Sequence, residues 1–213
     1  VMVEEAGGIS QADAVLIYHQ RYAKDPYGEL LGITSYFNDT YPLFVKPANA
    51  GSSVGISKVK NAEELPKALE TAFAEDDKVL VEEAITGREI EVAVLGNEEP
   101  EASCIGEIFA ANEFYDYNAK YENDASKTAV VTDLDPKKEQ EIKDTAVKIY
   151  RIMGCRGLAR VDFFLKDSGR VVFNEINTLP GFTNISMYPQ LWEASGIPYP
   201  DLIDRLIELA LEQ

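Results

Sequence analysis

Residues 160–187, RVDFFLKDSGRVVFNEINTLPGFTNISM, form the stretch on which the predicted fold depends. The runs 161–165 and 171–176 are rich in β-branched and aromatic residues, which favour strands. Residues 167–169, DSG, lie between the two runs and have side chains typical of a tight turn. The stretch therefore predicts a β-hairpin followed by a specialised loop.

Polar residues alternate along both strands of this hairpin. Arg160 and Asp162 share one face of the first strand, and Glu175 and Asn177 share one face of the second. A two- or four-residue turn would pair Asp162 with Phe173 and Arg160 with Glu175, which brings all four polar side chains to one face. A three-residue turn would split them between the two faces, so the register is a testable expectation.

Three oxygen donors on one face, Asp162, Glu175 and Asn177, are typical of a site for Mg²⁺ or Mn²⁺. The alternative is a solvated hairpin face with an ordinary Arg–Glu pair across the strands. The following loop favours the site, because Pro180 fixes one φ angle and Gly181 allows backbone N–H groups to approach an oxyanion.

The combined pattern RVDFF…NEINTLPGFT closely resembles the signature of the ATP-grasp superfamily, specifically the D-alanine–D-alanine ligases. The resemblance implies that Asp162, Glu175 and Asn177 hold two divalent ions, Mg²⁺ or Mn²⁺, which bridge the phosphates of ATP. It also implies that Arg160 and the amide of Gly181 stabilise a tetrahedral intermediate.

A second motif, PANAGSSVG at residues 47–55, follows the predicted strand 41–46. Its small residues and hydroxyls suit a phosphate-binding loop, although GSSVG alone is more often a hairpin tip and no P-loop ending is present. By resemblance this is the loop that covers the ATP phosphates, with Lys46 on the α- and β-phosphates. Ser52 has a catalytic role and Ser53 a nucleotide-binding role in that comparison.

Acidic residues near the next turn are implied to read the nucleoside. The resemblance assigns Glu82 and the backbone from Glu83 to Ile85 to the adenine edge, and Glu89 to the ribose hydroxyls. Among 37 acidic residues, a single glutamate is usually solvated surface. These assignments therefore depend mainly on the resemblance.

The polar and aromatic stretch FYDYNAKY, residues 114–121, has the character of a binding loop. By resemblance Lys120 binds phosphate, and Tyr121 hydrogen-bonds toward the first substrate and favours an amino nucleophile. Ser186 and Met187 lie where the family binds the carboxylate of the second D-alanine. The alternative for Ser186 is a simple cap of the following turn.

Composition excludes several classes of function. With 213 residues and 46% hydrophobic content, the chain can bury the core of one or two domains. A net charge of −17 argues against nucleic acid or an anionic membrane as a partner. Cys104 and Cys155 lack metal or redox spacing, and His19 is the only histidine. No apolar run reaches membrane-span length and no signal peptide is visible, so a cytoplasmic protein is expected.

The remaining patterns predict an α+β fold. Strands are expected over 14–18, 41–46, 78–85, 89–95 and 104–109, and helices over 27–33, 65–73, 136–153 and 201–211. The resemblance implies the ATP-grasp fold, in which two α+β subdomains with mainly antiparallel sheets, here 1–85 and 86–213, clamp ATP.

The function implied by the resemblance is ATP-dependent joining of two D-alanines through an acyl phosphate, for peptidoglycan synthesis. A D-alanine–D-serine ligase is the alternative enzyme. The chain begins without methionine, so we expect a fragment without the family's N-terminal domain, and an ATP-binding fragment without turnover is a further alternative. The intact enzyme is expected to be a homodimer.

Overall fold

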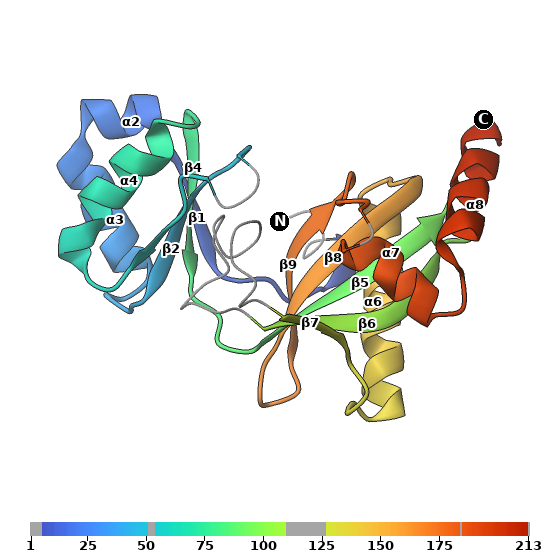
Figure 1. The fold of residues 1–213 in the computed structure, drawn as a ribbon. Helices are drawn as coiled ribbons and strands as arrows, with labels where there is room; N and C mark the ends of the chain where they lie inside the picture. The colour runs from blue at the N-terminus through green and yellow to red at the C-terminus, as the bar shows by residue number, and fades with distance from the viewer. Residues whose placement is uncertain (1–5, 51–53, 110–126, 184, 213) are drawn as a thin grey trace. The chain divides into compact units, whose positions relative to one another are not determined.

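The computed structural model of the protein describes residues 6–50, 54–109, 127–183 and 185–212. These residues form two compact units (Figure 1). We call residues 12–85 the small unit, and the described residues of 1–11, 86–109 and 127–213 the large unit. In the described segments, no helix has both the length and the apolar character needed to cross a membrane.

The small unit contains a four-stranded antiparallel sheet in the order β1-β4-β2-β3. Its strands are β1 (Ala14–Tyr18), β2 (Leu43–Pro47), β3 (Ser57–Val59) and β4 (Lys78–Glu83). Alternation places Leu43, Val45, Val79 and Val81 in the hydrophobic core, where they are at most 1% exposed. The residues between them, which include Lys46 and Glu82, point to the opposite face of the sheet.

Helices α2 (His19–Lys24), α3 (Pro26–Tyr36) and α4 (Leu65–Phe73) complete the small unit. Side chains cap two of the helix starts. Asp25 accepts the N–H of Gly28 ahead of α3 at 2.9 Å, and Asn61 accepts the N–H of Glu64 at 3.3 Å in the 3-10 turn η1 (Ala62–Glu64) before α4.

The large unit contains a five-stranded antiparallel sheet in the order β7-β6-β5-β8-β9. The strands are β5 (Arg88–Gly96), β6 (Glu101–Phe109), β7 (Lys127–Val130), β8 (Gly157–Leu165) and β9 (Val171–Asn177). Helix α6 (Pro136–Ile152) packs on one face, and α7 (Met187–Ala194) and α8 (Tyr199–Leu211) pack on the other.

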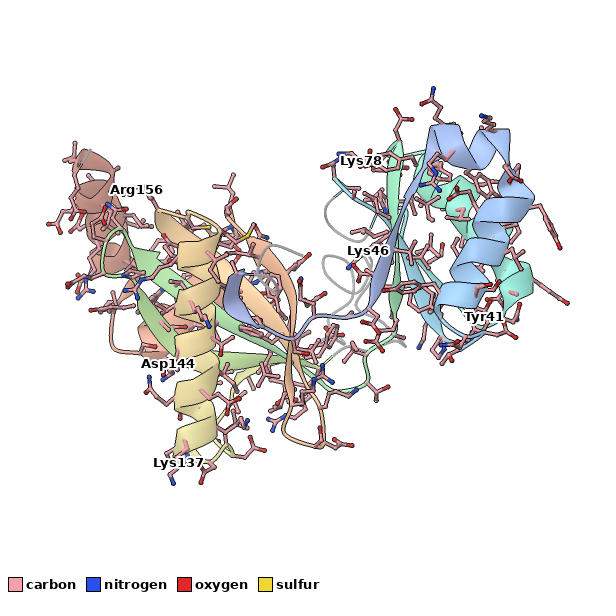
Figure 2. All side chains as sticks on the ribbon, turned by 180° about the vertical axis from the view of Figure 1, so that it is seen from behind. Tyr41, Lys46, Lys78, Lys137, Asp144 and Arg156 are labelled. Atoms are coloured by element: carbon pink, nitrogen blue, oxygen red, sulfur yellow. The ribbon has the colours of Figure 1, made fainter. Side chains whose placement is uncertain are left out.

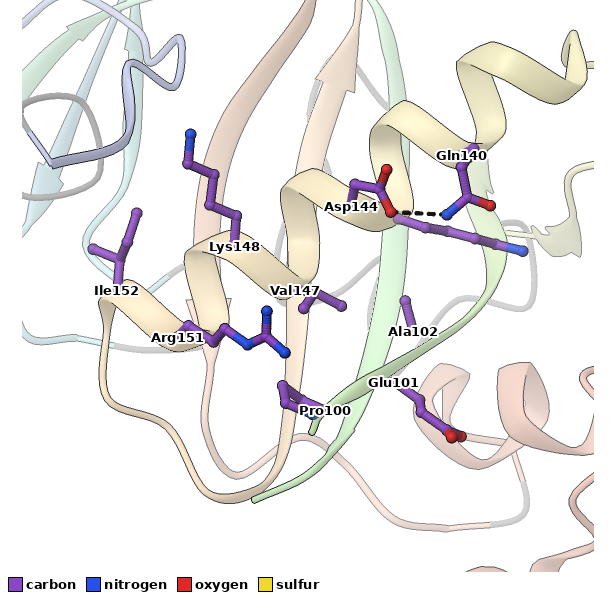
Figure 3. Close-up of a pocket in the computed structure, with 10 residues that line it drawn as sticks. Pro100, Glu101, Ala102, Gln140, Asp144, Val147, Lys148, Arg151 and Ile152 are labelled. Carbon is purple, nitrogen blue, oxygen red and sulfur yellow. Dashed lines mark hydrogen bonds between the residues drawn. The ribbon is translucent and has the colours of Figure 1, made fainter. Parts of the chain in front are cut away.

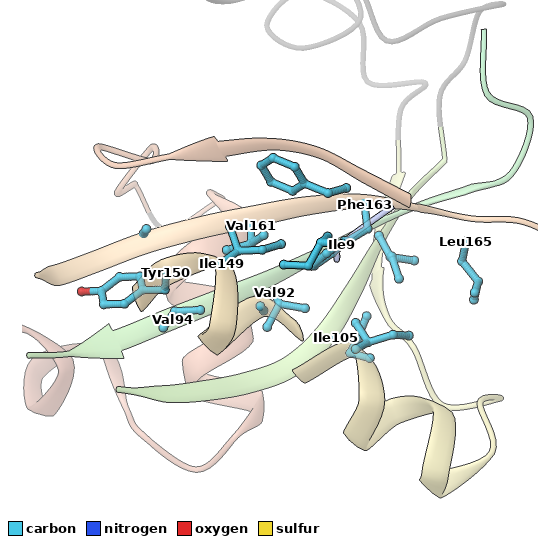
Figure 4. Packing of buried hydrophobic residues seen from close by; sticks show 14 residues of the cluster. Ile9, Val92, Val94, Ile105, Ile149, Tyr150, Val161, Phe163 and Leu165 are labelled. Carbon is cyan, nitrogen blue, oxygen red and sulfur yellow. The ribbon is translucent and has the colours of Figure 1, made fainter. Parts of the chain in front are cut away.

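Each face of this sheet has its own hydrophobic cluster. Val92, Val161 and Phe163 pack under α6 with Ile149 and Tyr150 (Figure 4). On the other face, Ala93 and Leu95 of β5 pack against residues of α7 and α8. Residues 90–96 of β5 are buried, with apolar side chains on both faces, so a charged residue within this part of the strand needs a specific partner.

Most predicted elements are confirmed, including the α+β class and the mainly antiparallel sheets. The predicted helix over 27–33 is α3, which is longer at both ends. Four elements were not predicted from the sequence: α2, β3, β7 and α7. The α7 sequence MYPQLWEA contains Pro189, but proline is compatible with the first turn of a helix, where its missing N–H has no intrahelical partner.

Candidate active site

The hairpin formed by β8 and β9 has a register different from the predicted one. Arg160 pairs with Asn177, and Asp162 pairs with Glu175. The pairs expected for a two- or four-residue turn, Arg160 with Glu175 and Asp162 with Phe173, are not formed, and each observed partner lies two positions further along β9. Directly opposed side chains lie on the same side of an antiparallel sheet, so the four polar side chains nevertheless share one face.

A β-bulge at Asn174 explains this result. The turn has three residues, 167–169, since the N–H of Lys166 donates to the carbonyl of Arg170 at 3.0 Å. Such a turn alone would split the polar set between the two faces, but Asn174 is an extra residue without a partner on β8 and shifts the alternation by one. Consistent with this, Phe173 and Ile176 both pack in the cluster under α6 although they are three positions apart.

Arg160 is held between two carboxylates on this face. Its Nε and Nη2 atoms donate to the two oxygens of Asp162, each at 2.8 Å, and Nε lies 3.2 Å from Oε1 of Glu91 on β5. Burial alone would lower the pKa of Arg160, but the charges of Asp162, Glu91 and Glu175 outweigh it and raise the pKa above its ordinary value. The guanidinium is therefore a permanent positive charge inside an acidic cluster.

The predicted metal ligands Asp162, Glu175 and Asn177 lie on the same face of β8 and β9. Their oxygens fit a hard cation that retains several waters. Within the described segments, no three His, Cys, Asp or Glu side chains form a group suited to a metal, so this donor set depends on two carboxylates and one amide. Asp162 would also have to serve both Arg160 and the cation.

The loop after β9 is held by its own side chains. Oδ1 of Asn177 accepts the N–H of Leu179 at 3.1 Å, and Oγ of Ser186 accepts the N–H of Thr183 at 3.0 Å. A Cβ added at Gly181 would lie 2.9 Å from Oγ of Ser186, so a side chain at this position would require the Ser186 hydroxyl to move. Glycine at this position leaves an exposed backbone beside a hydroxyl group.

Phe182 anchors the loop to the two following helices. Its ring lies 5.7 Å from that of Tyr188 in α7 and 5.6 Å from that of Tyr199 in α8, between ring centroids. Tyr199 also donates a hydrogen bond to the carbonyl of Phe182 at 3.0 Å. These contacts fix the backbone immediately after Gly181 relative to α7 and α8.

Ser186 precedes α7 in the N-cap position. Among the described residues its side chain hydrogen-bonds to Thr183 and not to an N–H group of the helix. Ser186 is therefore the N-cap residue of α7, but its side chain does not cap the helix. The side chain of Met187 is buried between β6 and α7, next to Gly106 and Leu191. Met187 could therefore contact a ligand through its backbone only.

In the small unit, Lys46 and Glu82 form an ion pair on the sheet face opposite the core. Nζ of Lys46 lies 2.6 Å from Oε2 of Glu82, and the two side chains are 23% and 19% exposed. Lys46 is labelled in Figure 2. Neighbouring strands position them, because β2 pairs Phe44 with Glu82 and Lys46 is two residues further along β2. The lysine predicted to bind phosphate thus contacts the glutamate predicted to bind adenine.

The segment predicted to read adenine is partly engaged within the small unit. Oε1 of Glu83 accepts the N–H of Asp13 at 3.1 Å, and the N–H of Glu83 donates to the Asp13 carbonyl at 3.0 Å. The N–H of Ala84 donates to the carbonyl of Pro42 at 3.2 Å. Ile85 is half-buried and follows β4.

Glu89 and Glu91 are both on β5 and point to the face that carries Arg160. Glu89 is half-buried at the start of the strand, opposite Phe164 of β8. Glu91 is 3% exposed and pairs with Asp162. Sequence reasoning missed Glu91, although a glutamate inside the apolar strand EIEVAVL was an available signal.

Four predicted site residues, Ser52, Ser53, Lys120 and Tyr121, lie outside the described residues. Their predicted roles stay predictions.

A groove of about 740 Å³ lies between α6 and the start of β6 (Figure 3). Its lining includes Glu101, Lys143, Asp144, Lys148 and Arg151. None of the predicted site residues lines it. Its main helix, α6, packs on the sheet face opposite the Arg160 cluster, so the groove is separate from the candidate site.

Comparison with known proteins identifies the family. Residues 3–208 match the family described as D-ala D-ala ligase C-terminus. The chain is 62% identical over 172 residues to D-alanine–D-alanine ligase B of Clostridium tetani, covering 80% of this chain and 48% of that protein. It is 52% identical over 215 residues to the D-alanine–D-alanine ligase of Acetivibrio thermocellus, covering 100% and 56%.

Solved structures agree with this result. The D-alanine–D-alanine ligase from Coxiella burnetii superposes with a TM-score of 0.83 at 41% identity, over 99% of this chain and 54% of that one. The VanG D-Ala:D-Ser ligase from Enterococcus faecalis gives a TM-score of 0.82 at 40% identity, over 98% and 59%. The chain spans about half the length of the relatives it matches, and it belongs to the D-alanine–D-alanine ligase family, whose C-terminal part it matches.

Proposed function

We propose that the whole protein is an ATP-dependent ligase that joins two D-alanines into D-alanyl-D-alanine for peptidoglycan synthesis. The observation that carries the proposal is the set of Arg160, Asp162, Glu175 and Asn177 on one sheet face in a chain of this ligase family. An arginine beside hard oxygen donors can serve a reaction that moves a phosphoryl group and then forms an oxyanion.

The carboxylate of the first substrate must be activated, because a carboxylate oxygen is a poor leaving group when an amine attacks the carbon. The carboxylate of the first D-alanine attacks the γ-phosphorus of ATP, which gives an acyl phosphate and ADP. The amine of the second D-alanine then attacks the acyl carbon, loses a proton, and phosphate leaves with the oxygen. Divalent metal ions, when bound, supply neutralisation of the charge on the phosphates.

The residues of the large unit divide this work. Asp162, Glu175 and Asn177 would hold the metal ions. Arg160 and the N–H of Gly181 would donate to the oxyanion of the tetrahedral intermediate, where one well-placed donor contributes about 3 kcal/mol. The exposure of Gly181 supports this role, because its backbone is accessible without a side chain to cover it.

Other residues would bind the nucleotide. We assign Lys46, with Ser53 and Lys120, to the phosphates, Glu82 and the backbone from Glu83 to Ile85 to adenine, and Glu89 to the ribose. The Lys46–Glu82 ion pair supports the assignment, since it holds the lysine ammonium beside Glu82 on the sheet face opposite the core. The N–H groups of Glu83 and Ala84 are engaged within the sheet, so the adenine contacts would come from other backbone groups of this segment.

The two amino-acid substrates would be bound by other groups. We assign Ser52 and Tyr121 to the first D-alanine, and Ser186 with the backbone of Met187 to the carboxylate of the second. D-serine is the alternative second substrate, and the TM-score of 0.82 to the VanG D-Ala:D-Ser ligase keeps it open. We further propose that the protein acts in the cytoplasm as a homodimer.

Two experiments test the proposal. Calorimetric titration of this chain with a non-hydrolysable ATP analogue and Mg²⁺, repeated on E175Q, tests nucleotide and metal binding. We expect metal-dependent binding that weakens in E175Q and stays unchanged in E141Q, an exposed glutamate on α6 that serves as the matched control. Equal binding by wild type and E175Q would contradict the metal assignment, and absent binding would leave an ATP-binding role without support.

The second experiment uses the protein in its whole length. Release of ADP is measured with D-alanine alone and with D-alanine plus D-serine, and the dipeptides are identified by mass spectrometry. D-alanyl-D-alanine as the main product supports the proposal, whereas a predominance of D-alanyl-D-serine would support the alternative. ADP release without any dipeptide would refute both ligase assignments.

A further inference from the structure

Glu91 is a buried charge that none of the roles above uses. It lies in the middle of β5, is 3% exposed, and pairs with Asp162 of β8. Its Oε1 atom lies 3.2 Å from Nε of Arg160, whose own side chain is 16% exposed. A buried carboxylate is costly unless a cation compensates it, and Arg160 is the cation that it contacts.

Asp162 alone would not keep Arg160 in one position if it also bound a metal ion. Both Asp162 oxygens accept hydrogen bonds from Arg160, and the proposed function also gives Asp162 to a metal ion. A metal ion drawn to Asp162 would compete with the guanidinium for the same lone pairs. The second carboxylate, on the neighbouring strand, contacts the same Nε atom.

We propose that Glu91 is a positioning residue that keeps the guanidinium of Arg160 in place while Asp162 binds a metal ion. This inference rests on the proposed function for the role of Arg160, but not for the contact itself. A guanidinium has five N–H donors, and the two bonds to Asp162 account for two of them. When the guanidinium plane is held in one orientation, its remaining N–H donors stay directed at the position where the oxyanion would form.

The chain offers a matched control in Glu107. This residue is also a buried glutamate, 8% exposed, and it is paired with an arginine, Arg88. It lies on the neighbouring strand β6 but opposite Ile90, on the sheet face under α6. E107Q therefore makes the same chemical change, next to a guanidinium, on the other side of the sheet.

The first test is spectroscopic and needs no turnover. In ¹⁵N NMR spectra of this chain, the Nε–H signal of Arg160 is assigned by its loss in R160K. We expect E91Q to shift this signal and to increase its exchange with solvent by about tenfold, since the acidic group nearest to Nε after Asp162 becomes neutral. E107Q should move the Arg88 signal and leave that of Arg160 unchanged. An Arg160 signal identical in wild type and E91Q would overturn the inference.

Fluorescence of Trp192, the only tryptophan, verifies that each variant retains the packing of the large unit. If E91Q loses this packing, E91D replaces it, because the shorter acid keeps the charge and withdraws from Nε. E91D should then give the same change of the Arg160 signal, and an unchanged signal would overturn the inference in the same way.

The second test is a double-mutant cycle in the whole-length enzyme. We expect E91Q to lower kcat by about 10- to 100-fold with little change in KM, as for other misplaced catalytic groups. In an R160K background E91Q should have no further effect on kcat, and E107Q should retain the wild-type kcat. Additive effects of E91Q and R160K would overturn the inference. If the wild type makes no dipeptide, the proposed function fails, and the NMR result alone decides whether Glu91 positions Arg160.

Discussion

Replacing Gly106 by alanine tests how the large unit's sheet holds the start of α7. A Cβ at this position would lie 2.7 Å from Sδ of Met187 and 2.9 Å from Cδ2 of Leu191. Contacts between such atoms are ordinarily about 3.5–4.0 Å, so the α7 side chains would have to move by roughly 1 Å. Overpacking costs about 1–3 kcal/mol, and the glycine-to-alanine change returns about 0.4–1 kcal/mol. We therefore expect G106A to lower the free energy of unfolding of the large unit by about 1–2 kcal/mol.

A second substitution tests whether Met187 is the residue that the added methyl group of G106A contacts. M187A alone should lower the free energy of unfolding by about 2–5 kcal/mol through the cavity that it creates. In G106A/M187A the new methyl group enters this cavity, so the combined loss should be smaller than the sum by about 1 kcal/mol or more. A sum that holds within about 0.5 kcal/mol would show that Gly106 and Met187 do not share this space.

The assay is urea unfolding followed by Trp192 fluorescence. Trp192 is 2% exposed and belongs to the same cluster as Met187 and Leu191, so its signal reports on this packing and not on the small unit. The control is G32A in α3, where an added Cβ has no atom within 4 Å. G32A should stabilise the small unit by up to about 1 kcal/mol and leave the Trp192 transition unchanged. A G106A variant as stable as the wild type would refute the packing argument.

Two further predictions concern ion pairs. K46M should destabilise the small unit by about 1–3 kcal/mol, since it leaves the mostly buried Glu82 without this cation. K46M/E82L should recover most of that loss in urea unfolding followed by circular dichroism. A double variant no more stable than K46M would contradict this. The Arg88 hydrogen bonds lower the pKa of Asp133 below its ordinary value of 3.8. As the pH falls, Asp133 is therefore protonated in the unfolded chain before it is protonated in the folded chain. The difference in free energy of unfolding between wild type and D133N should be constant above about pH 5 and shrink as the pH falls below 3.8. A constant difference in Trp192-monitored urea unfolding down to pH 3 would contradict this.

The sequence predicted the strands of the central hairpin and the polar set that they carry, because alternation and turn residues are local properties. The register could not be predicted, because the bulge at Asn174 has no glycine or proline to indicate it. A polar residue on an exposed strand face is compatible with a regular ladder as well as with a bulge. Glu91 was missed for a different reason: its role depends on Arg160, which lies 69 positions away in the chain and becomes its neighbour only through the pairing of β5 with β8.

The prediction of α7 failed because two patterns compete in that segment. Met187, Tyr188, Leu191 and Trp192 are all buried, at a spacing that suits one broad helix face. Pro189, also in this segment, is usually interpreted as an interruption. The contacts of Phe182 with Tyr188 and Tyr199 show what the sequence alone could not, namely that the loop and two helices form one packed group.

The small unit is an insertion whose two ends meet. Its first and last strands, β1 and β4, are neighbours, and Asp13 and Glu83 exchange two hydrogen bonds where the chain enters and leaves. Such an arrangement behaves as an exchangeable module, since a short linker could replace it without stretching the chain at either end. It is also tolerant of damage, because a single proteolytic cut in one connection leaves the unit attached through the other.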